Sequence, residues 1–221
     1  MSTKSITLFL LLLVATSVHA GKITDRPLSR VGLTFQGGYG FQNIDMVDLE
    51  EGGTSTISFG GGAGGSFLLG HEFSSHFDLS ASIGVYATSL QPVVSNADIT
   101  FSSFRFSITP AYIIPIRDGN RMRVKVGAGF DLSFSSELEI NMEEIPDGFK
   151  DTWTYDRAVG YHISGNFEVN ASRRWLFSGG LQYNGINYDF ESSSNRFPID
   201  SDLESPNGSD IIIVFGAYYC F

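Results

Sequence analysis

Long hydrophobic runs are almost absent from this chain. The one continuous apolar stretch, 6–14, is shorter than the roughly 20 residues that a bilayer-spanning helix needs, which excludes a helical membrane protein. The stretch follows Lys4 and leads to small residues ending at Ala20, a pattern typical of a secretory signal peptide. We therefore predict that residues 1–20 are a cleavable signal and that the chain from Gly21 is exported.

Cysteine is nearly absent as well, because Cys220 is the only one in the sequence. A single cysteine cannot form a disulfide within the chain, so an exported protein of this kind must be stabilised by other means. A sheet that closes on itself is one such means. We expect no metal or redox chemistry from Cys220 and no cofactor.

Basic residues are scarce, with 14 Lys and Arg against 24 Asp and Glu and a formal net charge of −10. This balance argues against nucleic acid as a partner, since such binding depends on neutralising phosphates. No Pro/Ser-rich linker divides the chain after the signal. We predict one domain over 21–221.

Strict two-residue alternation is the strongest pattern that is present. In 77–88 apolar side chains alternate with polar or small ones, and 122–135 repeats the pattern. Soluble sandwiches have strands of about 5 to 6 residues, whereas a strand tilted across a bilayer needs about 9 to 11. The length of both segments favours a membrane barrel with its apolar face toward lipid.

The same template predicts a closed, all-β, eight-stranded antiparallel up-and-down transmembrane barrel. The expected strands are 31–41, 55–69, 77–90, 98–115, 121–135, 153–169, 175–189 and 209–221. In the second strand Ile57 and Phe59 are expected to face outward. In the seventh, the apolar side chains change parity at Ile186 and Tyr188, which indicates a bulge or emergence above the bilayer.

The connections between these strands alternate between long and short. Long segments at 42–54, 136–152 and 190–208 are acidic and are expected to be extracellular loops, while short turns are expected in the periplasm. Arg173 and Arg174, followed by Trp175, resemble an anchor at the membrane interface. The acidic run Asp200, Asp202 and Glu204 could ligate calcium, but it lacks the turn glycine of a calcium loop, so solvated charge is the preferred interpretation.

The last segment alternates apolar residues up to a terminal aromatic one, with Phe215, Tyr219 and Phe221 on one face. This resembles the carboxy-terminal assembly signature of bacterial outer-membrane proteins, which implies recognition by the barrel-assembly machinery. Together with the signal and the alternating strands, it makes the chain resemble the small eight-stranded barrels of the OmpA, OmpX and opacity-protein type. The resemblance implies a cell outer membrane location among outer-membrane lipids and lipopolysaccharide.

An eight-stranded barrel has an interior just wide enough to be filled by side chains. Charges of both signs on the inward parity should pair there, because an isolated buried ion is costly. We predict a lumenal polar network that closes the barrel, with an open pore or proton path as the minority alternative. Its members are Asp78, Arg105, Arg123, Lys125, Asp131, His162, Gln182 and Glu168.

Three classes of function remain open. The first is a non-enzymatic, monomeric surface scaffold for envelope integrity, adhesion or defence, whose loops meet an extracellular ligand or host surface. The second is a small channel or an OmpW-like transporter of apolar molecules, with a pocket lined by Phe104, Phe106 or Tyr86 if the parity is shifted.

The third class is a lipid A deacylase that uses His162 and Ser164, with Glu168 as the orienting acid. This is the weakest of the three. These side chains have lumenal parity, and Glu168 would lie roughly 13 Å from His162 at about 3.3 Å per residue, too far for a hydrogen bond.

Overall fold

The computed structural model describes residues 29–49, 52–94, 97–116, 122–142, 149–195 and 201–221. The predicted signal peptide, 1–20, and the expected cleavage point at Gly21 lie outside these ranges. Within them, no helix is both long and apolar enough to cross a bilayer.

Strands account for most of the described chain, accompanied by one short helix. They are β1 Ser29–Gly40, β2 Ile44–Asp48, β3 Thr54–Ile57, β4 Gly62–Glu72, β5 Phe77–Ser89, β6 Ala97–Pro115, β7 Met122–Met142, β8 Phe149–Tyr155, β9 Ala158–Asn170, β10 Trp175–Gly185, β11 Phe190–Ser193 and β12 Asp210–Cys220, with helix α2 at Ser201–Glu204.

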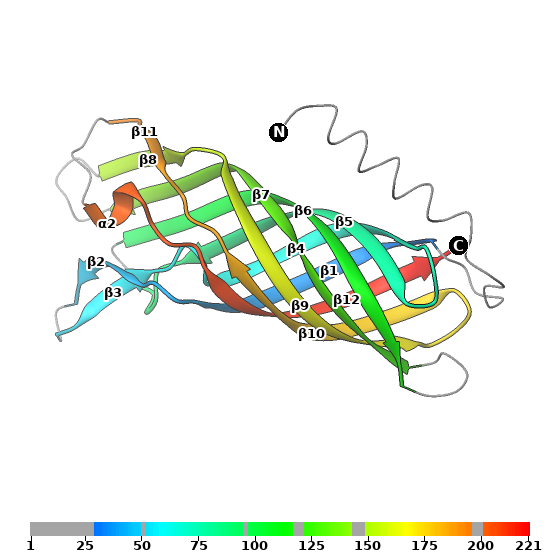
Figure 1. Cartoon of the computed structure of the whole chain (residues 1–221). Helices are drawn as coiled ribbons and strands as arrows, with labels where there is room; N and C mark the ends of the chain where they lie inside the picture. The colour runs from blue at the N-terminus through cyan, green and yellow to red at the C-terminus, as the bar shows by residue number, and fades with distance from the viewer. Residues whose placement is uncertain (1–28, 50–51, 95–96, 117–121, 143–148, 196–200) are drawn as a thin grey trace, which may run out of the picture.

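Eight of these strands close into an antiparallel barrel (Figure 1). The hydrogen-bonded order is β7-β6-β5-β4-β1-β12-β10-β9, and β9 pairs back onto β7. Closure leaves the barrel with no unpaired edge. The predicted fold class and strand count are confirmed. Since barrels of this kind place short turns in the periplasm, the end with the short β4–β5 and β9–β10 turns is assigned there.

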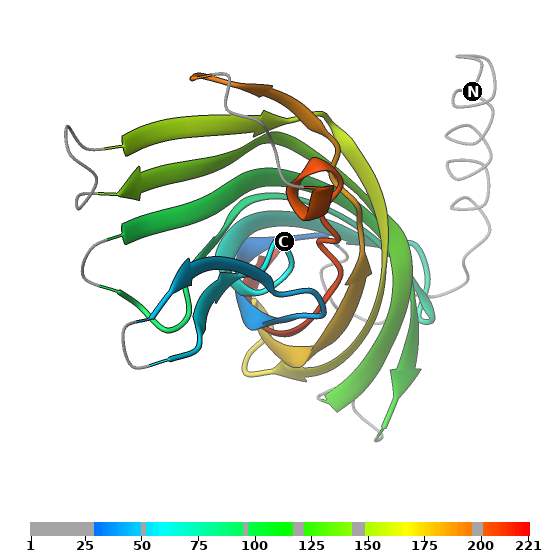
Figure 2. The same ribbon diagram turned by 90° about the vertical axis from the view of Figure 1, so that its left-hand side faces the viewer.

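At the opposite end, part of the sheet continues beyond the closed barrel, and this part is called the extension. Strand β7 pairs with β9 along 122–133 and with β8 along 136–142, so β6, β7, β8 and β11 project beyond the barrel (Figure 2). The predicted loop at 136–152 is therefore wrong where β7 and β8 form a strand pair. The predicted strand 153–169 is in fact two strands, separated at Asp156 and Arg157.

Apolar side chains face outward in the barrel but inward in this extension. In the barrel, Phe35 and Phe130 face outward, exposed by 64% and 73%, whereas in the extension Phe101 and Leu138 are fully buried inside. This is the arrangement expected of a barrel whose outer surface meets lipid below the boundary and water above it. Apolar side chains must therefore change sides along the same sheet.

Backbone irregularities produce part of this inversion. Strand β7 changes face at Ser135, which adopts a left-handed φ of 49° at a break in the β6–β7 register. An extra residue on one strand moves all later side chains to the opposite face. The same change occurs between β3 and β4, where Gly62 has φ 140°. The outward orientation expected for Ile57 and Phe59 is wrong for this reason, since each is only 1% exposed.

Other strands keep their alternation and change residue type instead. In β6 the inward residues change from Arg105 and Ser103 to Phe101 and Ile99 without a change of face. The chain after β10 behaves in the same way, because Ile186 and Tyr188 continue its inward parity after the ladder ends at Gly185. The irregularity predicted for the seventh strand is thus its emergence above the bilayer.

The inward side chains of the extension form an apolar cap over the barrel mouth. Phe59 is at its centre, with ring centroids 4.3 Å from Phe101, 5.1 Å from Tyr155 and 6.1 Å from Tyr188. Leu203 of α2 packs against the same cluster. Full burial of such a side chain is worth about 1.5–3 kcal/mol, so the cap stabilises the extension without help from the membrane.

Asp151 joins β8 to the segment that follows β11. Its carboxylate accepts hydrogen bonds from Trp153 Nε1 at 2.6 Å, Ser193 Oγ at 2.7 Å and Ser194 Oγ at 2.5 Å. Burial alone would raise the pKa of the Asp151 carboxyl, but the hydrogen bonds from Ser194, Ser193 and Trp153 hold this pKa at about 2. The charged form is therefore the one that the β8–β11 contact requires.

We expect this contact to loosen in acid. A carboxyl whose folded pKa is depressed from 3.8 to about 2 contributes stability above pH 3.8, and this contribution is lost as the pH falls toward 2. In a Trp175→Phe background, the emission of Trp153 should shift to the red across that window. Asp151→Asn should show the acid spectrum already at pH 7, and an unchanged spectrum in this variant would contradict the assignment.

Candidate functional site

The lower lumen is filled by six charged side chains that form one ion-paired cluster. They are Arg30 on β1, Glu72 on β4, Asp78 on β5, Arg123 and Lys125 on β7, and Glu168 on β9. All six are buried, at 7% exposure or less. Inward parity on each strand places them at neighbouring levels, and the barrel wall keeps them from water.

Asp78 is the centre of this cluster. Its Oδ2 lies 2.5 Å from Arg30 Nη1, its Oδ1 lies 2.8 Å from Arg30 Nη2, and Lys125 Nζ is 3.0 Å from Oδ1. The Arg30 contact is therefore bidentate, the geometry in which guanidinium–carboxylate pairs are strongest.

Arg123 links the remaining two carboxylates. Its Nε is 2.5 Å from Glu168 Oε2, and its Nη2 is 2.7 Å from Glu72 Oε1. Three cations thus face three anions. Such a cluster lowers the energy of each member only while the set is complete, since burying an unpaired charge costs several kcal/mol.

Sequence reasoning missed two members of the cluster, Arg30 and Glu72. The expected strands began at 31 and ended at 69, whereas β1 begins at Ser29 and β4 ends at Glu72. The alternation itself could have found both. Extending the first strand back by one residue and the second strand forward by three puts Arg30 and Glu72 on the inward faces of their strands.

A second hydrogen-bonded group lies above the ion cluster. His162 Nδ1 lies 3.0 Å from both carboxylate oxygens of Asp131, and His162 Nε2 lies 2.8 Å from the hydroxyl of Thr109. Ser107 donates to Asp131 at 2.5 Å. This orders His162 between three strands, β6, β7 and β9.

The grouping of His162, Ser164 and Glu168 considered for catalysis is not formed. The carboxylate beside His162 is Asp131, while Glu168 is engaged by Arg123 in the ion cluster. Ser164 lines the lumen near His162, but the hydroxyl hydrogen-bonded to the imidazole is that of Thr109. Asp131 is favoured over Glu168 because side chains on neighbouring strands lie closer to His162 than a side chain six residues along its own strand.

Arg105 marks the top of the polar lumen. Its guanidinium lies 5.2 Å from the ring centroid of Tyr86, and its Nε and Nη2 have no hydrogen-bond partner among the described residues. Nearby, Asn184 donates to Asp210. A lumenal cavity of about 80 Å³ is lined by Arg105, Tyr86 and Gln182 among others. It is large enough for a few water molecules but not for a lipid.

All members of the predicted lumenal network therefore lie inside the barrel. Phe104 and Phe106, considered as pocket residues, are on the outer face, and only Tyr86 of that set faces inward. Among the described residues no cluster of three acids, histidines or cysteines could hold a metal ion, and Asp200 lies outside the described ranges. Cys220 is buried beside Leu176 and Tyr218.

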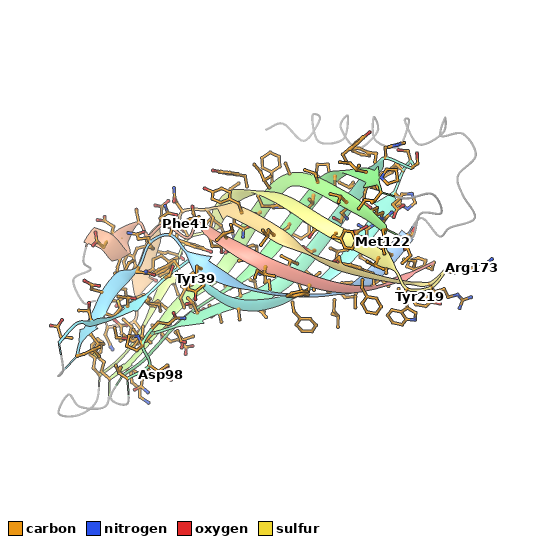
Figure 3. All side chains as sticks on the ribbon, turned by 90° about the horizontal axis from the view of Figure 1, so that it is seen from below. Tyr39, Phe41, Asp98, Met122, Arg173 and Tyr219 are labelled. Atoms are coloured by element: carbon orange, nitrogen blue, oxygen red, sulfur yellow. The ribbon has the colours of Figure 1, made fainter. Side chains whose placement is uncertain are left out.

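The outer surface carries aromatic side chains toward both ends of the barrel. Figure 3 shows Tyr219 and Arg173 at one end and Tyr39 and Phe41 toward the other. Trp175 packs edge-on against Tyr219 at 5.7 Å, and Arg174 Nη1 donates to the Tyr219 hydroxyl at 3.0 Å. Phe215 and Phe221 are exposed on the same outer face. This distribution is typical of interfacial girdles. The assembly role of Phe215, Tyr219 and Phe221 stays a prediction.

Comparison with known proteins also indicates an outer-membrane barrel. The family model of the outer membrane protein beta-barrel domain matches residues 7–192. The chain belongs to this family. It is accordingly a protein of the cell outer membrane. No curated protein sequence matches it.

Several solved structures are similar to this chain. Neisserial surface protein A is 11% identical with a TM-score of 0.51, and the match covers 87% of this chain and 97% of that one. OprG of Pseudomonas aeruginosa is 9% identical with a TM-score of 0.49, covering 89% and 97%. Ail of Yersinia pestis is 9% identical with a TM-score of 0.48, covering 90% and 100%. At such identities the likeness to the neisserial protein shows the fold alone.

Proposed function

We propose that this outer-membrane barrel is a non-enzymatic surface scaffold rather than a pore. The observation that carries the proposal is the doubly closed lumen. The ion cluster around Asp78 occupies the periplasmic half, the apolar cap around Phe59 covers the other end, and a lumenal cavity of about 80 Å³, lined by Lys125 and Arg105 among others, lies between them. An interior filled by side chains is what an eight-stranded barrel is expected to have.

The surface that such a scaffold offers is the projecting sheet of β6, β7, β8 and β11. Its outward side chains include the exposed carboxylates Asp98 and Glu139, which lie opposite Asn141 and Thr152 on the neighbouring strands. An extracellular ligand or host surface would meet this acidic face. The proposed role in adhesion, defence or envelope integrity requires only that the barrel hold this sheet rigidly as a monomer among outer-membrane lipids and lipopolysaccharide.

Conductance separates the scaffold from a channel. We expect the purified protein, reconstituted in planar bilayers, to give no current above that of protein-free membranes, because six buried, ion-paired side chains occupy the lower lumen. The gel mobility of the same sample, boiled and unboiled, checks that it was folded. Reproducible conductance steps from folded protein would contradict the scaffold proposal.

Transport of apolar molecules is the second candidate, and one observation favours it. The interior of the extension is lined by aromatic and aliphatic side chains, including Phe101 and Tyr188. If this cluster admits ligands, folded protein in vesicles should accelerate entry of an apolar fluorescent probe such as a naphthalene derivative. A scaffold leaves the entry rate at that of empty vesicles.

A further inference from the structure

The outer wall of the barrel is hollowed near its extracellular end. The groove has a volume of about 740 Å³. Its floor lies at one level of three neighbouring strands, where Gly37 pairs with Ala63 and Ala63 pairs with Ala87. Ala63 and Ala87 are exposed on the outer face. Larger residues at equivalent levels elsewhere, such as Leu181 and Ile213, stand at the side of the groove.

The groove is apolar on one side and polar at its extracellular rim. Its flank is built by Leu181, Ile211, Ile213 and Tyr39, the last of which is 78% exposed. Uncharged polar side chains, Ser89, Gln91 and Thr100, lie toward the extracellular end. None of the described lining residues carries a formal charge.

The fold does not require glycine on this floor. A Cβ added to Gly37 would meet only the carbonyl oxygen of Gly62, at 3.6 Å, which is an ordinary van der Waals distance. The next residue differs, since a Cβ on Gly38 would lie 2.1 Å from the carbonyl oxygen of Ile211. Gly38 is thus required by the packing of the lumen side, whereas the space above Gly37 is open and available to something outside the chain.

We propose that this groove binds an acyl chain of an outer-leaflet lipid, with the polar part of the lipid at Ser89, Gln91 and Thr100. The groove is continuous with the lipid-facing belt, because Phe35 and Val85 follow it toward the periplasm on β1 and β5. It therefore opens onto hydrocarbon. Its uncharged rim fits ester or hydroxyl groups by hydrogen bonding.

A second copy of the chain fits this surface less well. A two-fold interface would bring the same patch of both copies together, and two concave floors of small residues would leave a void between them. A flexible acyl chain can fill such a hollow and gain contacts along its whole length.

Filling the groove tests the proposal. Gly37→Leu and Ala63→Leu place a side chain where the lipid is expected, and Ala128→Leu is the matched control at an exposed outward position of β7 outside the groove. Each delipidated protein in detergent is mixed with lipid A, the acylated anchor of lipopolysaccharide in the outer leaflet, and bound lipid is counted by native mass spectrometry. We expect one bound lipid on the wild type and on Ala128→Leu. Binding to Gly37→Leu and Ala63→Leu should be about tenfold weaker, because the lipid would lose the burial of about two methylene groups.

Folding is checked on unboiled gels, so a misfolded variant is not mistaken for one that lost its lipid. Equal lipid binding by folded Gly37→Leu and wild type would overturn the proposal, as would a wild type that binds no lipid. Dimers of the wild type that become monomers in the filled variants would also overturn it, because the groove would then be a surface for self-association.

Discussion

Asp78→Ala is expected to destabilise the barrel by about 3–5 kcal/mol, the cost of breaking a buried ion pair from one side. Asp78 is fully buried and holds both Arg30 and Lys125. Without it three buried cations share only two carboxylates, Glu72 and Glu168. The change is measured from urea unfolding in detergent or lipid, followed by gel mobility and tryptophan fluorescence.

Two variants control for this result. Asp98→Ala removes an exposed carboxylate on β6 and should change stability by no more than about 0.5 kcal/mol. Asp78→Asn keeps the shape and some hydrogen bonds but not the charge, so it should lie between the two. If Asp78→Ala unfolds at the same urea concentration as Asp98→Ala, the ion cluster is not what closes and stabilises the lower lumen.

Phe59→Ala is expected to cost about 3–5 kcal/mol as well, but in a different part of the molecule. Phe59 is at the centre of the apolar cap and packs on Phe101, Tyr155 and Tyr188. The extension depends on this cap because it has no lipid around it. Hydrogen exchange should show lost protection along 136–142, where β7 pairs with β8, and retained protection along 122–133, where β7 pairs with β9.

Phe35→Ala is the matched control for this experiment. Phe35 is an aromatic residue of the same barrel that faces lipid, so its loss should leave protection along 136–142 unchanged. Uniform loss of protection in Phe59→Ala along the whole of β7 would contradict this prediction, because the extension and the barrel would then unfold as one unit.

The alternation in 77–88 and 122–135 was sufficient to predict the barrel, because a pleated strand sends successive side chains to opposite faces. The inward charges followed from the same parity. Arg30 and Glu72 were missed only because strand ends are poorly defined by alternation. Alternation along a single strand does not show which residues pair across neighbouring strands. The acid beside His162 is Asp131 on β7 rather than Glu168 on its own strand, since that choice depends on the cross-strand register.

The sequence by itself determined a closed, eight-stranded membrane barrel with a charged interior, because periodicity and strand length are local properties of the chain. Only the tertiary structure decided which charges pair, where the membrane barrel ends and that β7 and β8 continue above it. The reason is that a change of solvent from lipid to water reverses which face is buried. Ile57 and Phe59 look the same in sequence in either environment, and only the position of Gly62 relative to the neighbouring strands shows which side of that boundary they occupy.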